Sequence, residues 1–118
     1  MSTCEQIAQY VARAEWGQLS WEARDKLRQH LLDAIGCALG ALNAGPIAAI
    51  RAEERSVSCS GPCSLIRGGA SSPERAAFYN GALIRYLDFM DAFIAKEEAC
   101  HPSDNIGALL AAAEIEFI

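Results

Sequence analysis

Two acidic residues and a histidine in the second half of the sequence have the chemistry needed for proton transfer. Asp88 and Asp91 stand at the predicted end of one helix, and His101 comes immediately before the predicted start of another. Helix N-termini carry unpaired backbone N–H groups and the positive end of the helix dipole, which suit an anionic substrate. Because an imidazole gains and loses a proton near neutral pH, the pattern indicates general acid–base chemistry.

The same residues also have purely structural interpretations, which their spacing leaves open. Asp88 meets the unfavourable end of a helix dipole, and it could be there only to pair with Arg85, three residues earlier. The sequence from His101 onward could be an ordinary helix start, in which Ser103 or Asp104 accepts hydrogen bonds from unpaired N–H groups. The spacing of these residues therefore fits either acid–base catalysis or a purely structural role.

The elements that would position these residues are predicted to be helices. The clearest has Ser20 as its N-cap, apolar residues at 3.6-residue spacing, and a stop at residues 43–46. We predict an all-α fold of about five helices and one irregular Ser/Gly-rich loop at 55–72. The helices are expected from a Thr3 capping box to Gly17, from Ser20 to Asn43, from Pro46 to Glu54, from Ser72 to about Leu87, and from Pro102 onward.

The helix after Ser20 carries two further expectations. Leu27, Leu31 and Leu39 belong to its apolar stripe, and an apolar face of this helix is expected to lie bare if it normally packs against partners outside residues 1–118. Gly36 and Gly40 lie four residues apart, and such small residues let a second helix approach closely.

Composition excludes several classes of function. The chain has 118 residues, 52% of them apolar, and its net charge of -5 includes ten scattered Lys and Arg residues. Nucleic-acid binding needs a clustered basic surface, so no nucleic-acid partner is expected. No stretch approaches the ~20 apolar residues that span a bilayer, and residues 1–15 do not resemble a signal peptide. We expect a soluble, cytoplasmic protein with no membrane partner.

The cysteines point to reduced thiols. The chain has five cysteines, an odd number with irregular gaps, whereas small secreted domains usually carry an even set. Cys59 and Cys63 form a C-x3-C pair, but no second pair or nearby histidine supports a metal site. We therefore predict no bound metal, and we expect Cys37 to be a small apolar residue on a helix.

Several segments together resemble the MmgE/PrpD family, which includes 2-methylcitrate dehydratases and cis-aconitate decarboxylases. The similarity is strongest in Asn80-Gly81, in Leu87-Asp-Phe-Met-Asp91 and in His101-Pro-Ser-Asp-Asn105, in that order. It extends upstream to residues 31–40 and 72–81 and covers nearly the whole chain. Within the family, the segment from His101 is most similar to the 2-methylcitrate dehydratases.

The resemblance implies a fold and a reaction. Family members have a helical domain and a smaller α/β lid domain, often in homodimers, with the active site between the two domains. They eliminate water or carbon dioxide from small polycarboxylates without a required iron–sulfur cluster. The resemblance implies catalytic roles for Asp88 and His101, substrate binding by Asp91 and Ser103, no cofactor, and a homo-oligomeric state.

This sequence departs from the family pattern at the expected site. Ala92 stands where the family usually has threonine, Met90 where asparagine is common in the dehydratases, and Cys100 where a small residue precedes the histidine. Family members are also several times longer, so we expect residues 1–118 to be the N-terminal portion of the helical domain, without the lid. Two hypotheses follow, a truncated dehydratase-type lyase and a non-catalytic helical remnant or self-association module.

Overall fold

A computed structural model of the chain describes residues 1–57 and 60–116. It is mostly helical, which confirms the predicted all-α class, and the described part contains five α-helices, two 3-10 helices and two very short hairpins. The α-helices are α1 (Thr3–Arg13), α2 (Trp21–Gly40), α3 (Gly45–Ser56), α4 (Pro73–Tyr86) and α5 (Ile106–Glu116). The 3-10 helices are η1 (Trp16–Gln18) and η2 (Pro102–Asn105). The strands are β1 (Cys63–Ser64), β2 (Ala70–Ser71), β3 (Phe93–Ile94) and β4 (Ala99–Cys100).

Local capping signals place the helix starts. The Ser20 hydroxyl accepts a hydrogen bond from the Ala23 N–H at 3.1 Å, so the predicted N-cap of α2 is confirmed. The capping box of α1 is formed by Ser2 and Glu5, one residue before the predicted Thr3 and Gln6. Pro73 opens α4 after Ser72, whose hydroxyl bonds the Glu74 side chain and not the backbone.

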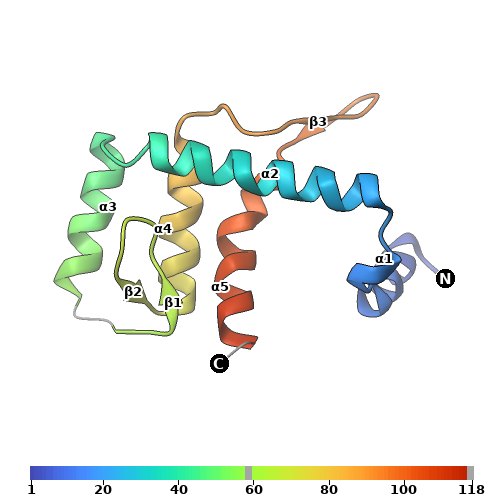
Figure 1. Cartoon of the computed structure of the whole chain (residues 1–118), viewed down its shortest axis with the longest axis horizontal. Coiled ribbons are helices and arrows are strands. Elements are labelled where there is room, and N and C mark those ends of the chain that lie inside the picture. Colours follow the sequence, from blue (N-terminus) through green and yellow to red (C-terminus); the bar gives the residue numbers. More distant parts are fainter. Residues whose placement is uncertain (58–59, 117–118) are drawn as a thin grey trace.

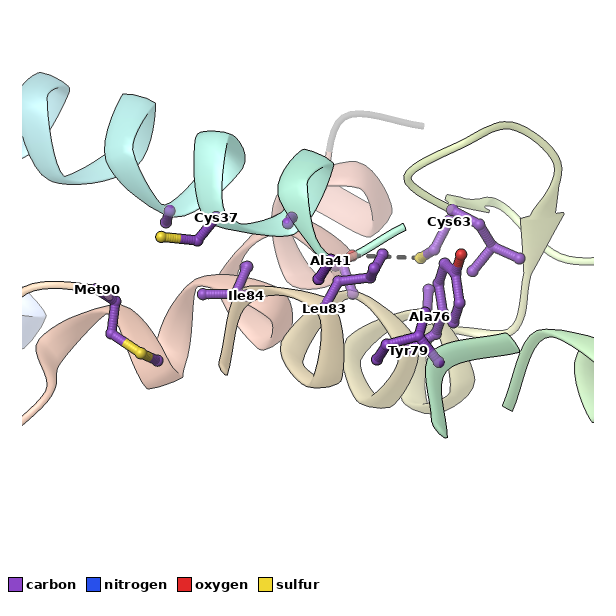
Figure 2. Close-up of a cluster of buried hydrophobic side chains, with 13 residues drawn as sticks. Cys37, Ala41, Cys63, Ala76, Tyr79, Leu83, Ile84 and Met90 are labelled. Carbon is purple, nitrogen blue, oxygen red and sulfur yellow. Dashed lines mark hydrogen bonds between the residues drawn. The ribbon is translucent and has the colours of Figure 1, made fainter. Parts of the chain in front are cut away.

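Figure 1 shows α2 running across one end of α4 and α5, with α3 beyond the C-terminal end of α2 and alongside α4, and with α1 beyond the other end of α2. Helix α4 is in the middle of this arrangement and packs against α2, α3 and α5. Its Tyr79, Leu83 and Ile84 are almost completely buried. They form the centre of the core shown in Figure 2, together with Cys63 of β1, whose thiol donates to the Ala111 carbonyl at 3.4 Å.

The segment between α3 and α4 forms a hairpin that is fastened to α4. Strands β1 and β2 pair antiparallel, Cys63 with Ser71. Asn80, which is buried on α4, accepts from the Ile66 N–H at 3.0 Å and donates to the Ser64 carbonyl at 2.9 Å. The predicted loop is therefore correct in place, and it contains a short antiparallel pair of strands.

Glycine allows the closest helix contact. A Cβ atom on Gly107 of α5 would lie 2.6 Å from the Gly81 nitrogen and 2.8 Å from the Ala77 carbonyl oxygen of α4. The expectation for α2 is correct at Gly40, where a Cβ would meet Leu87 at 2.8 Å, and wrong at Gly36, where no atom lies within 4 Å.

The apolar stripe of α2 is only partly buried. Ala34, Cys37 and Ala38 are in the core, which confirms the expectation for Cys37. Leu27 and Leu39 are 50% and 54% exposed, so part of the apolar face of α2 lies bare. Within the described residues, α2 packs mainly against α4 and also touches η2.

Among the described residues, no single helix has both the length and the apolar composition to cross a bilayer. Helices α2 and α3 meet these criteria only when taken together, and they are bent by 87° relative to each other.

Candidate functional site

The centre of the candidate site is the carboxylate of Asp91, whose side chain is 5% exposed. Its Oδ1 atom accepts a hydrogen bond from the Ser103 N–H at 3.1 Å and a second from the Ser103 hydroxyl. Its Oδ2 atom lies 3.2 Å from Nδ1 of His30. Because a buried carboxylate is costly without partners, these contacts are what keep Asp91 in place.

His101 is fixed by the backbone of the same aspartate. Its Nδ1 atom lies 2.7 Å from the Asp91 carbonyl oxygen. A carbonyl oxygen can only accept, so Nδ1 must carry the proton and donate. In the neutral imidazole the lone pair is therefore on Nε2, which can accept a proton from a substrate. The half-buried ring combines a fixed orientation with access to solvent.

Local sequence explains how Ser103 reaches Asp91. Pro102 opens η2, where its missing N–H costs nothing, and His101 is the extended residue before it. Ser103 is 1% exposed and gives both its N–H and its hydroxyl to Asp91. The helix η2 has no side-chain cap, so the reading of this segment as an ordinary cap does not describe it.

Asp88 lies outside this cluster of hydrogen bonds. Its side chain is 70% exposed and pairs with Arg85, the partner proposed in the structural reading. Arg85 also approaches Asp104 of η2, with Nε and Oδ1 separated by 3.7 Å. The backbone of Asp88 has a φ of 56°, a left-handed conformation that turns the chain sharply after α4 and that aspartate tolerates better than most residues.

A cleft of about 320 Å³ adjoins the Asp91 carboxylate. Its polar side is formed by His30, Asp91 and Ser103, and its apolar side by leucines of α2 and α5 together with Pro102 and Ile106. Among the predicted site residues, the structure thus brings Asp91, Ser103 and His101 together and places two of them on a cleft. It leaves Asp88 on the surface near η2.

His30 is the residue of this cluster that sequence reasoning did not identify. It lies on α2 next to Leu31, is of intermediate burial, and no motif around it indicates a function. The packing of α2 against η2 brings it to Asp91. Its one sequence signal is that it is one of two histidines in the chain.

Within 1–57 and 60–116, no three His, Cys, Asp or Glu side chains come together in a way that could hold a metal ion. Cys37 and Cys63 are buried free thiols, and Cys4 and Cys100 are exposed free thiols. The C-x3-C pair cannot be assessed, because Cys59 lies outside the described residues.

Fold and site together define a mostly helical domain that carries a carboxylate–serine–histidine cluster at the start of a helix. A family model, described as the MmgE/PrpD N-terminal domain, matches residues 5–116. The chain therefore belongs to the MmgE/PrpD family, as the motifs indicated.

The relatives with curated names are dehydratases. The chain is 36% identical to the 2-methylcitrate dehydratase of Cupriavidus necator over 92% of its own length, and 38% identical to that of Escherichia coli K12 over the same share. It is 40% identical to an alkylcitrate dehydratase of a fungal species over 72% of its length. It spans 22%, 22% and 17% of these three proteins, respectively. No solved structure matches the chain.

Proposed function

We propose that this chain supplies the acid–base part of the active site of a lyase of the 2-methylcitrate dehydratase type. The parent reaction is the elimination of water from a small polycarboxylate. The observation that carries the proposal is the contact of His101 Nδ1 with the Asp91 carbonyl, which leaves Nε2 as the basic atom. The names of the relatives supply the substrate class.

Each expected site residue has a role in this proposal. Elimination requires removal of a proton from a carbon beside a carboxylate, and departure of hydroxide that must itself be protonated. His101 Nε2 is placed to move one of these protons, and Asp88 is the second catalytic residue, by its match to the family motif. Asp91 and Ser103 bind substrate from the cleft that they line. The reaction as proposed uses no cofactor.

The chain by itself is expected to be inactive. Proximity and orientation supply roughly 7–11 kcal/mol of barrier reduction, and they depend on several groups being held together. A single acid–base residue supplies roughly 10²–10⁴-fold. Ala92 lacks the hydroxyl that the family usually has there, and the relatives are about four times as long as the chain, which covers 22% of them.

A chimera tests the proposal with a complete enzyme. Residues 5–116 replace the matching segment of the Escherichia coli enzyme, with Ala92 retained or changed to threonine, and dehydration of 2-methylcitrate is followed by ultraviolet absorbance. We expect turnover in at least the threonine form, and a loss of about 10²–10⁴-fold in its His101→Ala variant. Glu97→Gln, an exposed change in the same connection, is the matched control. Two folded but inactive chimeras, or an active His101→Ala, would contradict the proposal.

A second candidate function, self-association, is favoured by the exposed apolar side chains. Trp21 and Leu32 of α2 are 67% and 73% exposed, and Leu109 of α5 is 62% exposed. Such surface is usually covered in a stable protein. We propose that copies of the chain associate through it, and light scattering at micromolar concentration is expected to give at least a dimer. A clean monomer, or association that persists unchanged in a Leu32→Glu, Leu109→Glu variant, would count against this surface.

The proposal includes a cytoplasmic location, supported by the odd number of cysteines, and no nucleic-acid partner, supported by the net charge of -5.

A further inference from the structure

His30 of α2 lies beside the Asp91 carboxylate of the candidate site. Its Nδ1 atom lies 3.2 Å from Asp91 Oδ2, and its side chain is 39% exposed. It lines the same cleft as Asp91 and Ser103. The family resemblance gave this residue no role.

The two oxygen atoms of Asp91 have different surroundings. Oδ1 receives two hydrogen bonds from Ser103. Oδ2 is buried, yet it accepts no hydrogen bond of good geometry from any described residue. A buried carboxylate oxygen without a donor is costly, and His30 Nδ1, which lies 3.2 Å from it, is within reach to donate. A hydrogen bond from His30 Nδ1–H would therefore satisfy the buried Oδ2 atom of Asp91.

Asp91 contacts two histidines, His30 through its side chain and His101 through its backbone carbonyl. The carboxylate is held between Ser103 and His30, while the carbonyl oxygen receives Nδ1 of His101. Fixing the carboxylate at both oxygens also fixes the orientation of the residue, and with it the direction of its carbonyl. Substitution of His30 should therefore change the orientation of the Asp91 carbonyl and, through it, the protonated ring nitrogen of His101. No direct contact between the two rings is required.

We propose that His30 is a positioning residue that holds Asp91 so that its carbonyl keeps His101 in the Nδ1–H form. This inference rests on the proposed function for its catalytic meaning, but its structural content can be tested on the chain itself. The inference makes α2 part of the site, because α2 carries His30. If α2 moves away from Asp91, the orientation of His101 is lost.

Long-range ¹H–¹⁵N spectra of the histidine rings measure this directly, because they show which ring nitrogen carries the proton. At alkaline pH, where imidazoles are neutral, we expect both His30 and His101 to be in the Nδ1–H form, which free histidine does not favour. In His30→Ala the ratio of Nδ1–H to Nε2–H in His101 should fall by about fivefold or more, equivalent to about 1 kcal/mol.

Two variants separate positioning from general damage. His30→Asn places an amide N–H where the Nδ1–H was, so it should keep most of the His101 ratio. Gln29→Ala, an exposed change beside it, should leave the ratio unchanged. Amide spectra report whether each variant is folded.

The outcomes are distinct from those of the dehydration assay. A wild-type His30 in the Nε2–H form would overturn the inference, and so would a folded His30→Ala with an unchanged His101 ratio. If His30→Ala does not fold, the wild-type form of His30 and the effect of His30→Asn decide. In each case the chimera can still be active, so failure here does not imply failure of the proposed function.

Discussion

Replacing Gly107 with alanine is expected to destabilise the chain, although alanine is the better helix former. The added Cβ atom would lie 2.6, 2.8 and 2.9 Å from backbone atoms of Gly81 and Ala77 on α4. Ordinary carbon contacts are about 3.5–4.0 Å, so α5 must move away from α4 by roughly 1 Å. A gap of that size loses a quarter to a half of the dispersion energy of each contact between α4 and α5.

The expected magnitude follows from two opposing effects. Overpacking of this kind costs about 1–3 kcal/mol. Alanine returns at most about 1 kcal/mol of helix propensity. The net loss should be about 1–2 kcal/mol, which for a chain of this size lowers Tm by roughly 3–12 °C.

The assay is urea unfolding followed by circular dichroism, with the same substitution at two other helical glycines as controls. A Cβ on Gly36 or on Gly81 would meet no atom within 4 Å. Alanine there should stabilise the chain by about 0.5–1 kcal/mol. The reasoning about the contact between α4 and α5 is refuted if Gly107→Ala is as stable as Gly36→Ala.

Four further predictions concern the Ser103 contact, the thiols and the activity of the isolated chain. Ser103→Ala should lower the free energy of unfolding by about 1.5–3 kcal/mol, since the Asp91 carboxylate loses a buried donor; an unfolding midpoint equal to wild type in urea would contradict this. Burial raises the pKa of the Cys37 and Cys63 thiols. Above about pH 8.5 the thiols of the unfolded chain ionise, while the buried thiols of the folded chain stay protonated. The free energy of unfolding should therefore fall as the pH rises above about 8.5. By peptide mapping, iodoacetamide should modify the exposed Cys4 and Cys100 before the buried Cys63, and equal rates at Cys63 would show that the core is open. The purified chain alone should not dehydrate 2-methylcitrate, and turnover lost in His101→Ala would show that it builds a complete site.

Helices were predictable where their signals are local. Ser20 caps α2 and Pro73 opens α4 through contacts within one turn, so the sequence next to them is sufficient. The pairing of the hairpins was not predictable, because each strand has only two residues and the β1–β2 hairpin is held by the distant Asn80. The exposed Leu27 shows that periodicity identifies an apolar stripe but not how much of it a neighbour covers.

The candidate site was predictable only in part. Asp91, Ser103 and His101 belong to motifs close together in the sequence, and the turn from His101 into η2 brings them together. His30 comes from a separate helix, and its approach depends on how α2 crosses α5. A pairing that tertiary packing creates leaves no signal in the spacing of a single sequence.

The role of His101 in moving the substrate proton is the central claim, and hydrogen exchange tests it most directly. The active chimera and its His101→Gln variant are incubated with 2-methylcitrate in D₂O, and deuterium in the recovered substrate is measured by mass spectrometry alongside dehydration. If Nε2 of His101 is the base, the variant loses both exchange and dehydration by about 10²–10⁴-fold. Exchange and dehydration at the parental rates in a folded His101→Gln would contradict the account.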